Sequence, residues 1–153
     1  MELRVQLELP CEPAVLAPWV ADLSAYPEWM GLVHQAVRQR GDEPAWAVDL
    51  RGRLGPLARS KRLRMVRTAP SAPGEARFER RELDGRSHSH WELTARWSAH
   101  GSGTAVDVVL RYDGSMWTAG LLERALHDQI EQAKERLRTL VSEGQVPGGG
   151  PTR

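Results

Sequence analysis

Apolar and polar residues alternate along most of this chain in the period-two pattern of half-buried β-strands. The first alternating segment runs from Leu3 to Leu9. After residue 32 the pattern is interrupted repeatedly by residues such as Gly, Pro and Asp, as in turns between antiparallel strands. Six further strands are predicted at 32–40, 45–53, 59–68, 75–83, 87–100 and 104–113.

The spacing of apolar residues changes to three and four on both sides of this strand region, which indicates helices. A short helix is predicted from Glu12 to Leu23, followed by a break and a second helical turn within 22–29. Ser115 to Glu143 is predicted as one long amphipathic helix, which Gly144 closes. At 1.5 Å per residue such a helix extends over roughly 40 Å, enough to lie along a whole curved sheet. Its apolar stripe comprises Leu122, Leu126, Ile130, Ala133, Leu137, Leu140 and Val141.

The length and charge of the chain limit its class. With 153 residues we predict one domain over 1–143 and a disordered tail over 144–153. The net charge of +1 argues against a nucleic-acid partner, and no apolar run approaches the roughly 20 residues that would insert into a membrane. Cys11 is the single cysteine, in agreement with a cytoplasmic location. No cofactor is predicted, and the oligomeric state stays open.

The predicted order is one strand, two short helices, six strands and a long helix. Antiparallel strands joined by tight turns form a meander with one apolar face. Among the predicted helices, the C-terminal one has the length to cover that face. The sequence therefore predicts an α+β container, and binding of a small molecule becomes the leading functional hypothesis.

Two stretches resemble the polyketide cyclase/dehydrase-like (START-like, SRPBCC) superfamily. The first is the opening helix pair, whose motif is matched by Asp22, Tyr26, Pro27 and Trp29. The second is the last hairpin, matched by 91–112. The resemblance implies a helix-grip (START/Bet v 1-like) fold: a bent seven-stranded antiparallel sheet, two short helices and a long C-terminal helix enclosing a hydrophobic cavity. Members bind lipids, quinones or polyketide intermediates, and some catalyse cyclisation or dehydration; 50–63 also resembles the quinone-binding branch.

Strand parity and the resemblance together select candidate cavity residues. Parity turns the polar side chains of Gln35, Lys61, Arg67 and Arg80 inward, where a cation can meet an anionic ligand group. Lys61 and Arg67 also fit strand ends from which their side chains reach water. The tryptophans fit either the cavity wall or ordinary core packing. The predicted cavity set is Tyr26, Trp29, Gln35, Trp46, Met65, Phe78, Arg80, Trp91, Tyr112 and Trp117.

Two polar clusters have simpler explanations than a functional site. His88 and His90 would share one face of a predicted strand, and we interpret them as solvated side chains because no further zinc ligands are marked. The basic strand 59–64 can attract an acidic partner, RNA or an anionic membrane. Pairing with Glu75, Glu79 and Glu82 of the next strand is the simpler interpretation.

Three functions remain after this reasoning. The first is binding or transport of a hydrophobic small molecule (lipid, quinone or polyketide-like). The second is a polyketide cyclase/dehydratase with Tyr26 and Arg80 as candidate catalytic residues, although the aromatic cyclases carry a fuller Trp-Pro pattern than this chain does. The third is an interaction protein using strand 59–64. We identify no inward Asp, Glu or His, which favours binding over catalysis.

Overall fold

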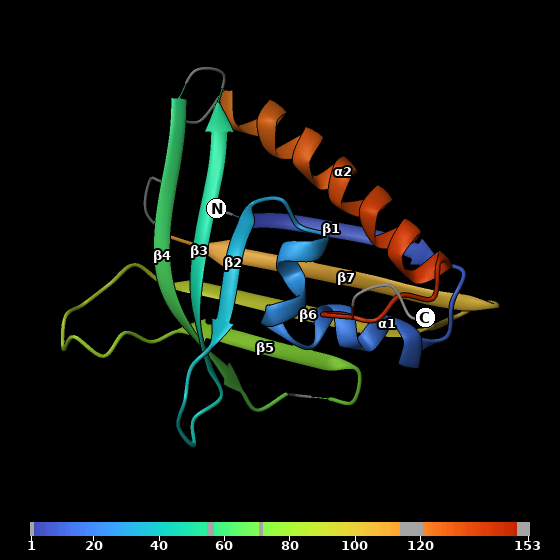
Figure 1. Cartoon of the computed structure of the whole chain (residues 1–153), viewed down its shortest axis with the longest axis horizontal. Helices are drawn as coiled ribbons and strands as arrows, with labels where there is room; N and C mark the ends of the chain where they lie inside the picture. Colours follow the sequence, from blue (N-terminus) through green and yellow to red (C-terminus); the bar gives the residue numbers. More distant parts are fainter. Residues whose placement is uncertain (1, 55–56, 71, 114–120, 150–153) are drawn as a thin grey trace.

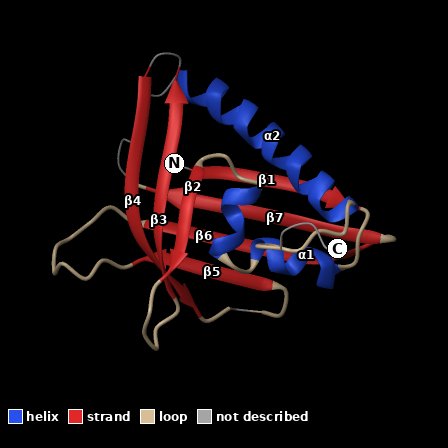
Figure 2. Ribbon diagram, viewed as in Figure 1, coloured by secondary structure: helices blue, strands red, loops and turns tan. Residues whose placement is uncertain are grey.

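The computed structural model describes residues 2–54, 57–70, 72–113 and 121–149. Within these ranges a strongly curved antiparallel sheet wraps around a long helix, with two short helices at one end (Figures 1 and 2). The elements are β1 (Glu2–Leu9), α1 (Pro13–Val20), the 3₁₀-helix η1 (Leu23–Glu28), β2 (Val33–Arg38), β3 (Ala45–Leu54), β4 (Leu57–Thr68), β5 (Glu75–Arg80), β6 (Trp91–His100), β7 (Gly103–Tyr112) and α2 (Leu121–Ser142).

The sheet has the strand order β1-β7-β6-β5-β4-β3-β2. Strands β2 to β7 form an uninterrupted meander, and β1 joins the far edge by pairing antiparallel with β7. The chain therefore crosses from one edge of the sheet to the other through α1 and η1, which close one end of the curved sheet (Figure 1). This agrees with the predicted α+β architecture, including its seven strands.

The junction of α1 and η1 is held by side-chain hydrogen bonds. The Asp22 carboxylate accepts from the backbone N–H of Ser24 at 2.9 Å and caps η1. The Tyr26 hydroxyl donates to the Val20 carbonyl at 2.9 Å, and the Trp29 indole N–H donates to the Trp19 carbonyl at 2.9 Å. These bonds satisfy carbonyls at the end of α1, so the motif that carried the family resemblance stabilises a helix junction.

Helix α2 lies diagonally across the concave face of the sheet (Figure 1). It ends as predicted at Gly144, whose φ of 67° is in the left-handed region. The N–H of Gln145 donates to Leu140 and that of Gly144 to Val141, which is the Schellman arrangement. The part of the predicted helix before residue 121 lies outside the described residues. Residues 143–144 and 147–148 form turns, and the N–H of Gly148 donates to Glu28; the predicted disorder of the tail stays a prediction.

The connection between β5 and β6 differs from the predicted tight hairpin at Asp84 and Gly85. Strand β5 ends at Arg80 and β6 begins at Trp91, so residues 81–90 form a loop and His88 and His90 are not on a strand. The loop is held by its own side chains: His88 Nε2 is 2.8 Å from the Asp84 carboxylate. These contacts replace the ladder hydrogen bonds that a longer hairpin would have made.

Two orientations predicted from parity are wrong. The pairing of β2 with β3 shifts register between Val33 and Gln35, which is a bulge. Beyond it Ala36 faces the core, whereas Gln35 is exposed and Val37 is 52% exposed. A bulge reverses every later side chain of a strand, and nothing in the alternation marked this one.

The expected pairing of the basic strand with the glutamates of the next strand is found only at Arg64, whose backbone N–H donates to the Glu82 carboxylate at 3.1 Å. Residues 59–64 of β4 pair with β3, because β4 meets β5 only from Met65 to Thr68. Glu75 instead pairs with Arg96 at 2.9 Å, and Arg64 with Glu43 at 3.1 Å. The length difference between the two strands decides this, since β5 is too short to reach the far half of β4.

Candidate functional site

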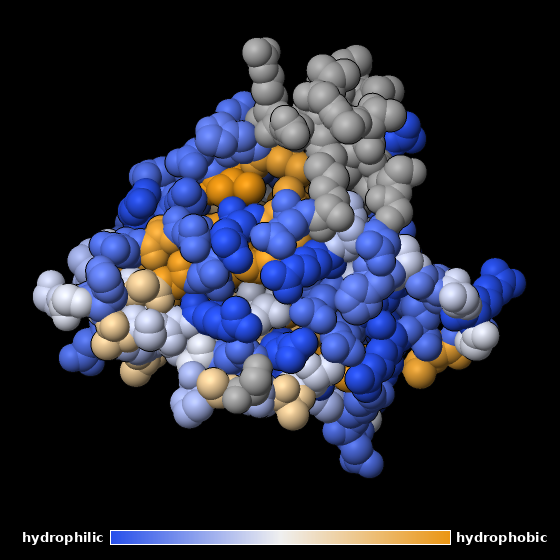
Figure 3. Space-filling model, turned by 180° about the vertical axis from the view of Figure 1, so that it is seen from behind, coloured by the Kyte–Doolittle hydropathy of each residue, from blue (hydrophilic) through white to orange (hydrophobic). Residues whose placement is uncertain are grey.

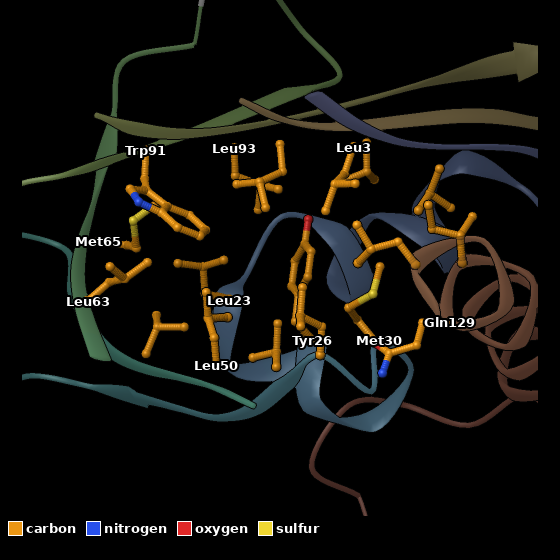
Figure 4. Close-up of a pocket in the computed structure, with 18 residues that line it drawn as sticks. Leu3, Leu23, Tyr26, Met30, Leu50, Leu63, Met65, Trp91, Leu93 and Gln129 are labelled. Atoms are coloured by element: carbon orange, nitrogen blue, oxygen red, sulfur yellow. The ribbon is translucent and has the colours of Figure 1, made fainter. Parts of the chain in front are cut away.

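A cavity of about 80 Å³ lies between the concave face of the sheet, η1 and α2. The 18 described residues that line it are drawn in Figure 4 and come from β1, β2, β3, β4, β6, β7, η1, the η1–β2 connection and α2. Trp91, Met65 and Leu63 lie at one end of the cavity, and Gln129 and Met30 at the other (Figure 4). Among the described residues, no lining side chain carries a charge.

Hydrophobic side chains are also visible from outside, on the side of the molecule that faces away from the viewer in Figure 1. Figure 3 shows them in a hollow between α2 and the sheet, bordered by hydrophilic residues. The α2 residues that line the cavity are Leu126, Gln129 and Ile130. The cavity is therefore an apolar space in the described core, bordered on one side by α2.

The structure brings three of the predicted cavity residues to the cavity wall: Tyr26, Met65 and Trp91. Trp29, Trp46, Phe78 and Tyr112 are buried but are not part of the lining. They pack behind the wall: Tyr26 lies 4.9 Å from Trp29 between ring centroids, Trp46 lies 5.4 Å from Phe78, and Trp91 stacks on Tyr112 at 4.6 Å. Trp117 lies outside the described residues.

The structure does not bring Gln35 or Arg80 to the cavity wall. Arg80 is opposite Met65 in the ladder, but its guanidinium donates to Glu82 at 3.0 Å and to the Ser89 hydroxyl at 3.1 Å. Its side chain is only 9% exposed, so the charge is neutralised within the loop of residues 81–90. This leaves Arg80 anchoring the loop, not facing the cavity.

The two other cations that parity turned inward have different environments. Arg67 is exposed at the end of β4, as expected for a cation that reaches water. Lys61 is half-buried, and its ammonium lies 5.8 Å from the centroid of the Trp91 ring. Lys61 therefore packs against the ring of a cavity residue, a contact that stabilises the cation although Lys61 is not in the described lining.

The phenol groups of both tyrosines are held in their neutral form. Burial raises the pKa of Tyr26 far above its ordinary value, and burial also raises the pKa of Tyr112. The Tyr26 ring lines the cavity, but its hydroxyl donates a hydrogen bond to the Val20 carbonyl. In this arrangement Tyr26 supplies an apolar ring surface and has no free proton for acid–base chemistry.

The described residues also bear on metal and membrane chemistry. No group of His, Cys, Asp and Glu among them has the arrangement of a metal site. None of the described helices is both long and apolar enough to cross a bilayer.

Several lining residues were missed by sequence reasoning. Leu3, Leu23, Met30 and Leu110 line the cavity but are absent from the predicted cavity set. Gln129 is the informative omission, because it lies three residues after Leu126 and four before Ala133, in register with the apolar stripe of α2. That spacing was a usable signal: a polar residue in an apolar stripe faces the same side as the stripe.

No model of a protein family and no curated protein matches this sequence. Solved structures do. The protein TTHA0849 from Thermus thermophilus superposes with a TM-score of 0.61 at 20% identity, covering 94% of this chain and 96% of that one. A START superfamily protein from Mycobacterium smegmatis gives 0.63 at 15% identity, covering 93% and 97%. Zhui aromatase/cyclase from Streptomyces sp. R1128 gives 0.63 at 10% identity, covering 94% of both chains.

These likenesses cover nearly the whole chain at low identity, so they establish the fold. The predicted helix-grip architecture and its resemblance to START-like and cyclase structures are confirmed at that level.

Proposed function

Because this chain has the helix-grip fold seen in START-like and aromatase/cyclase structures, we propose that it binds and carries a small apolar molecule in the cavity under α2. The observation that carries the proposal is the lining itself, which comes from nine parts of the fold and is almost entirely apolar. Burial of apolar surface stabilises a complex by roughly 25 cal/mol per Å². The lone Cys11 thiol agrees with a carrier in the reducing cytoplasm.

The size of the cavity narrows the class of ligand. A volume of about 80 Å³ is small beside the ~300–1,000 Å³ of typical ligand sites. A sterol or a long-chain lipid would require α2 or η1 to move outward. A flat molecule of one ring, such as the ring of a quinone, requires the least movement, and a two-ring molecule requires the cavity to widen further.

Carriage is favoured over catalysis by the polar groups around the cavity. The Tyr26 hydroxyl donates a hydrogen bond to the Val20 carbonyl, and Arg80 is paired with Glu82 away from the lining. General acid–base catalysis needs a titratable group within hydrogen-bond reach of the reacting atom. Tyr26 and Arg80, the candidate catalytic residues of a cyclase, therefore make hydrogen bonds that stabilise the fold.

The test is calorimetric titration with methylnaphthalene at two temperatures. We expect saturable binding with a negative heat-capacity change, the signature of apolar burial. Leu110→Trp fills the cavity from β7 and should weaken binding at least tenfold. Its matched control is Arg111→Trp, since the neighbouring residue is exposed on the opposite face of the same strand and should leave affinity unchanged.

Two results would contradict the carrier proposal. Equal binding to both tryptophan variants would place the ligand outside the cavity. Conversion of a bound polyketide-like molecule, slowed by Tyr26→Phe more than its binding is weakened, would favour the cyclase alternative, because a proton donor acts mainly in the transition state.

A further inference from the structure

Among the described residues that line the cavity, one side-chain oxygen is buried without a hydrogen-bond partner. The side-chain oxygen Oε1 of Gln129 is buried and has no hydrogen-bond partner. Gln129 lines the cavity and extends from α2 toward the end marked by Met30 (Figure 4). An unsatisfied buried acceptor is costly, so its presence in an otherwise apolar wall calls for a donor.

The other polar side chains of the described lining cannot supply that donor. Besides Gln129, only Tyr26 and Trp91 in this lining carry a side-chain nitrogen or oxygen. The Tyr26 hydroxyl donates to Val20 at 2.9 Å, and the Trp91 indole N–H donates to the Ser89 hydroxyl at 3.3 Å. Trp19 has an unpartnered indole N–H, but it does not line the cavity.

The backbone N–H groups around Gln129 are already hydrogen-bonded within the helix. Gln129 lies inside α2, where each N–H bonds to the carbonyl four residues earlier. The neighbouring lining residues of the helix, Leu126 and Ile130, are apolar. None of the described side chains or helix N–H groups around Oε1 supplies its partner, which leaves a molecule inside the cavity as the donor to test.

We propose that the ligand is a neutral apolar molecule with one hydroxyl group, an alcohol or a phenol, whose O–H donates to Gln129. The inference rests on the proposed carrier function and specifies its ligand. A carboxylate cannot fill this role, because an ionised carboxylate has no proton to donate and meets no charge in the described lining. Gln129 thereby selects hydroxylated molecules over hydrocarbons of the same shape.

The experiment compares matched probes: toluene with phenol, and methylnaphthalene with naphthol, with naphthoate as the anionic member. For the wild-type chain, calorimetry should show the hydroxylated member binding about five- to tenfold more tightly than its methyl counterpart, the scale of one satisfied hydrogen bond. Naphthoate should bind more weakly than either naphthalene derivative.

Gln129→Met keeps the length of the side chain and removes its polar group. It should abolish the preference for naphthol while methylnaphthalene binds as before or slightly better. Gln132→Met is the matched control, because Gln132 is exposed on the same helix and the same substitution there should preserve the preference. Melting provides a second readout: removing an unsatisfied buried oxygen should raise the melting temperature of ligand-free Gln129→Met by about 2–4 °C.

The outcomes separate the two proposals. If methylnaphthalene binds to the wild type and naphthol gains nothing over it, the role of Gln129 is refuted and the carrier function stands. If Gln132→Met loses the preference as fully as Gln129→Met, the effect is general to α2 and the assignment is likewise refuted. If no probe of either ring size binds, the carrier function fails, and the inference fails with it.

Discussion

At the scale of single residues, side chains that look functional in the sequence hold the fold together. Tyr26 and Trp29 use their polar atoms on carbonyls at the end of α1, and Arg80 uses its guanidinium on the loop that follows β5. Among the described residues that line the cavity, the one with an unpartnered side-chain oxygen is Gln129, which belongs to no sequence motif. Chemical type alone does not separate a binding group from a structural one, because the difference lies in whether its hydrogen bonds are already made.

The buried tyrosines give a prediction about pH. The chain has two tyrosines, and burial raises the pKa of each in the folded state. Their contribution to stability is therefore complete below the unfolded value of about 10 and is lost as the pH rises above it, because only the unfolded chain then releases the protons. An alkaline titration should show no phenolate absorbance before unfolding, with both signals changing together. Phenolate formation in a chain that is still folded by circular dichroism would contradict the buried placement of these groups.

At the scale of elements, the boundaries of helices and strands depend on local chemistry. Gly144 ends α2 with a positive φ, and the loop of residues 81–90 replaces a hairpin because its side chains bind one another. The end of α2 was predictable, since glycine at this position adopts the left-handed conformation without strain. The loop was not, because an Asp-Gly pair also occurs in hairpin turns of two residues.

The helix end gives a second prediction. Gly144→Ala forces a residue with a Cβ into the left-handed region and should lower the free energy of unfolding by about 1 kcal/mol. Gly31→Ala is the control, because that position has ordinary backbone angles and open space around the added carbon. Urea denaturation of both variants measures the difference. Equal stability of the two would show that the α2 terminus frays in solution.

At the scale of the whole molecule, the cavity exists because the side chains of the sheet, α2 and η1 leave space between them unfilled. The sheet curves away, α2 crosses it diagonally, and η1 closes one end (Figure 1). The packed cluster includes Ala133, Leu137 and Val141 of α2, so the second half of the helix is anchored in the core while Leu126 and Ile130 border the cavity. A helix with these two roles stabilises the fold and forms one wall of the site.

This arrangement predicts that the fold depends on α2. Deleting the chain from residue 122 onward should abolish cooperative thermal unfolding, because the apolar face of the sheet then has no cover. Deleting only residues 150–153 should change little, since every described core residue is retained. Calorimetry of both truncations decides the point. A chain without α2 that melts cooperatively near the normal temperature would refute the helix-grip packing.

The sequence by itself determined the number and order of the strands, the long terminal helix and the apolar face that the two share, because periodicity of two or of three to four is a local property of the chain. Tyr26, Met65 and Trp91, three of the predicted cavity residues, are among the described residues that line the cavity. Only the tertiary structure decided three facts: Gln35 points away from the core, the Arg80 guanidinium bonds to Glu82, and Gln129 Oε1 has no partner. Those three facts depend on a bulge, on a loop that folds back and on atoms from distant segments. Alternation along one strand carries no information about any of them.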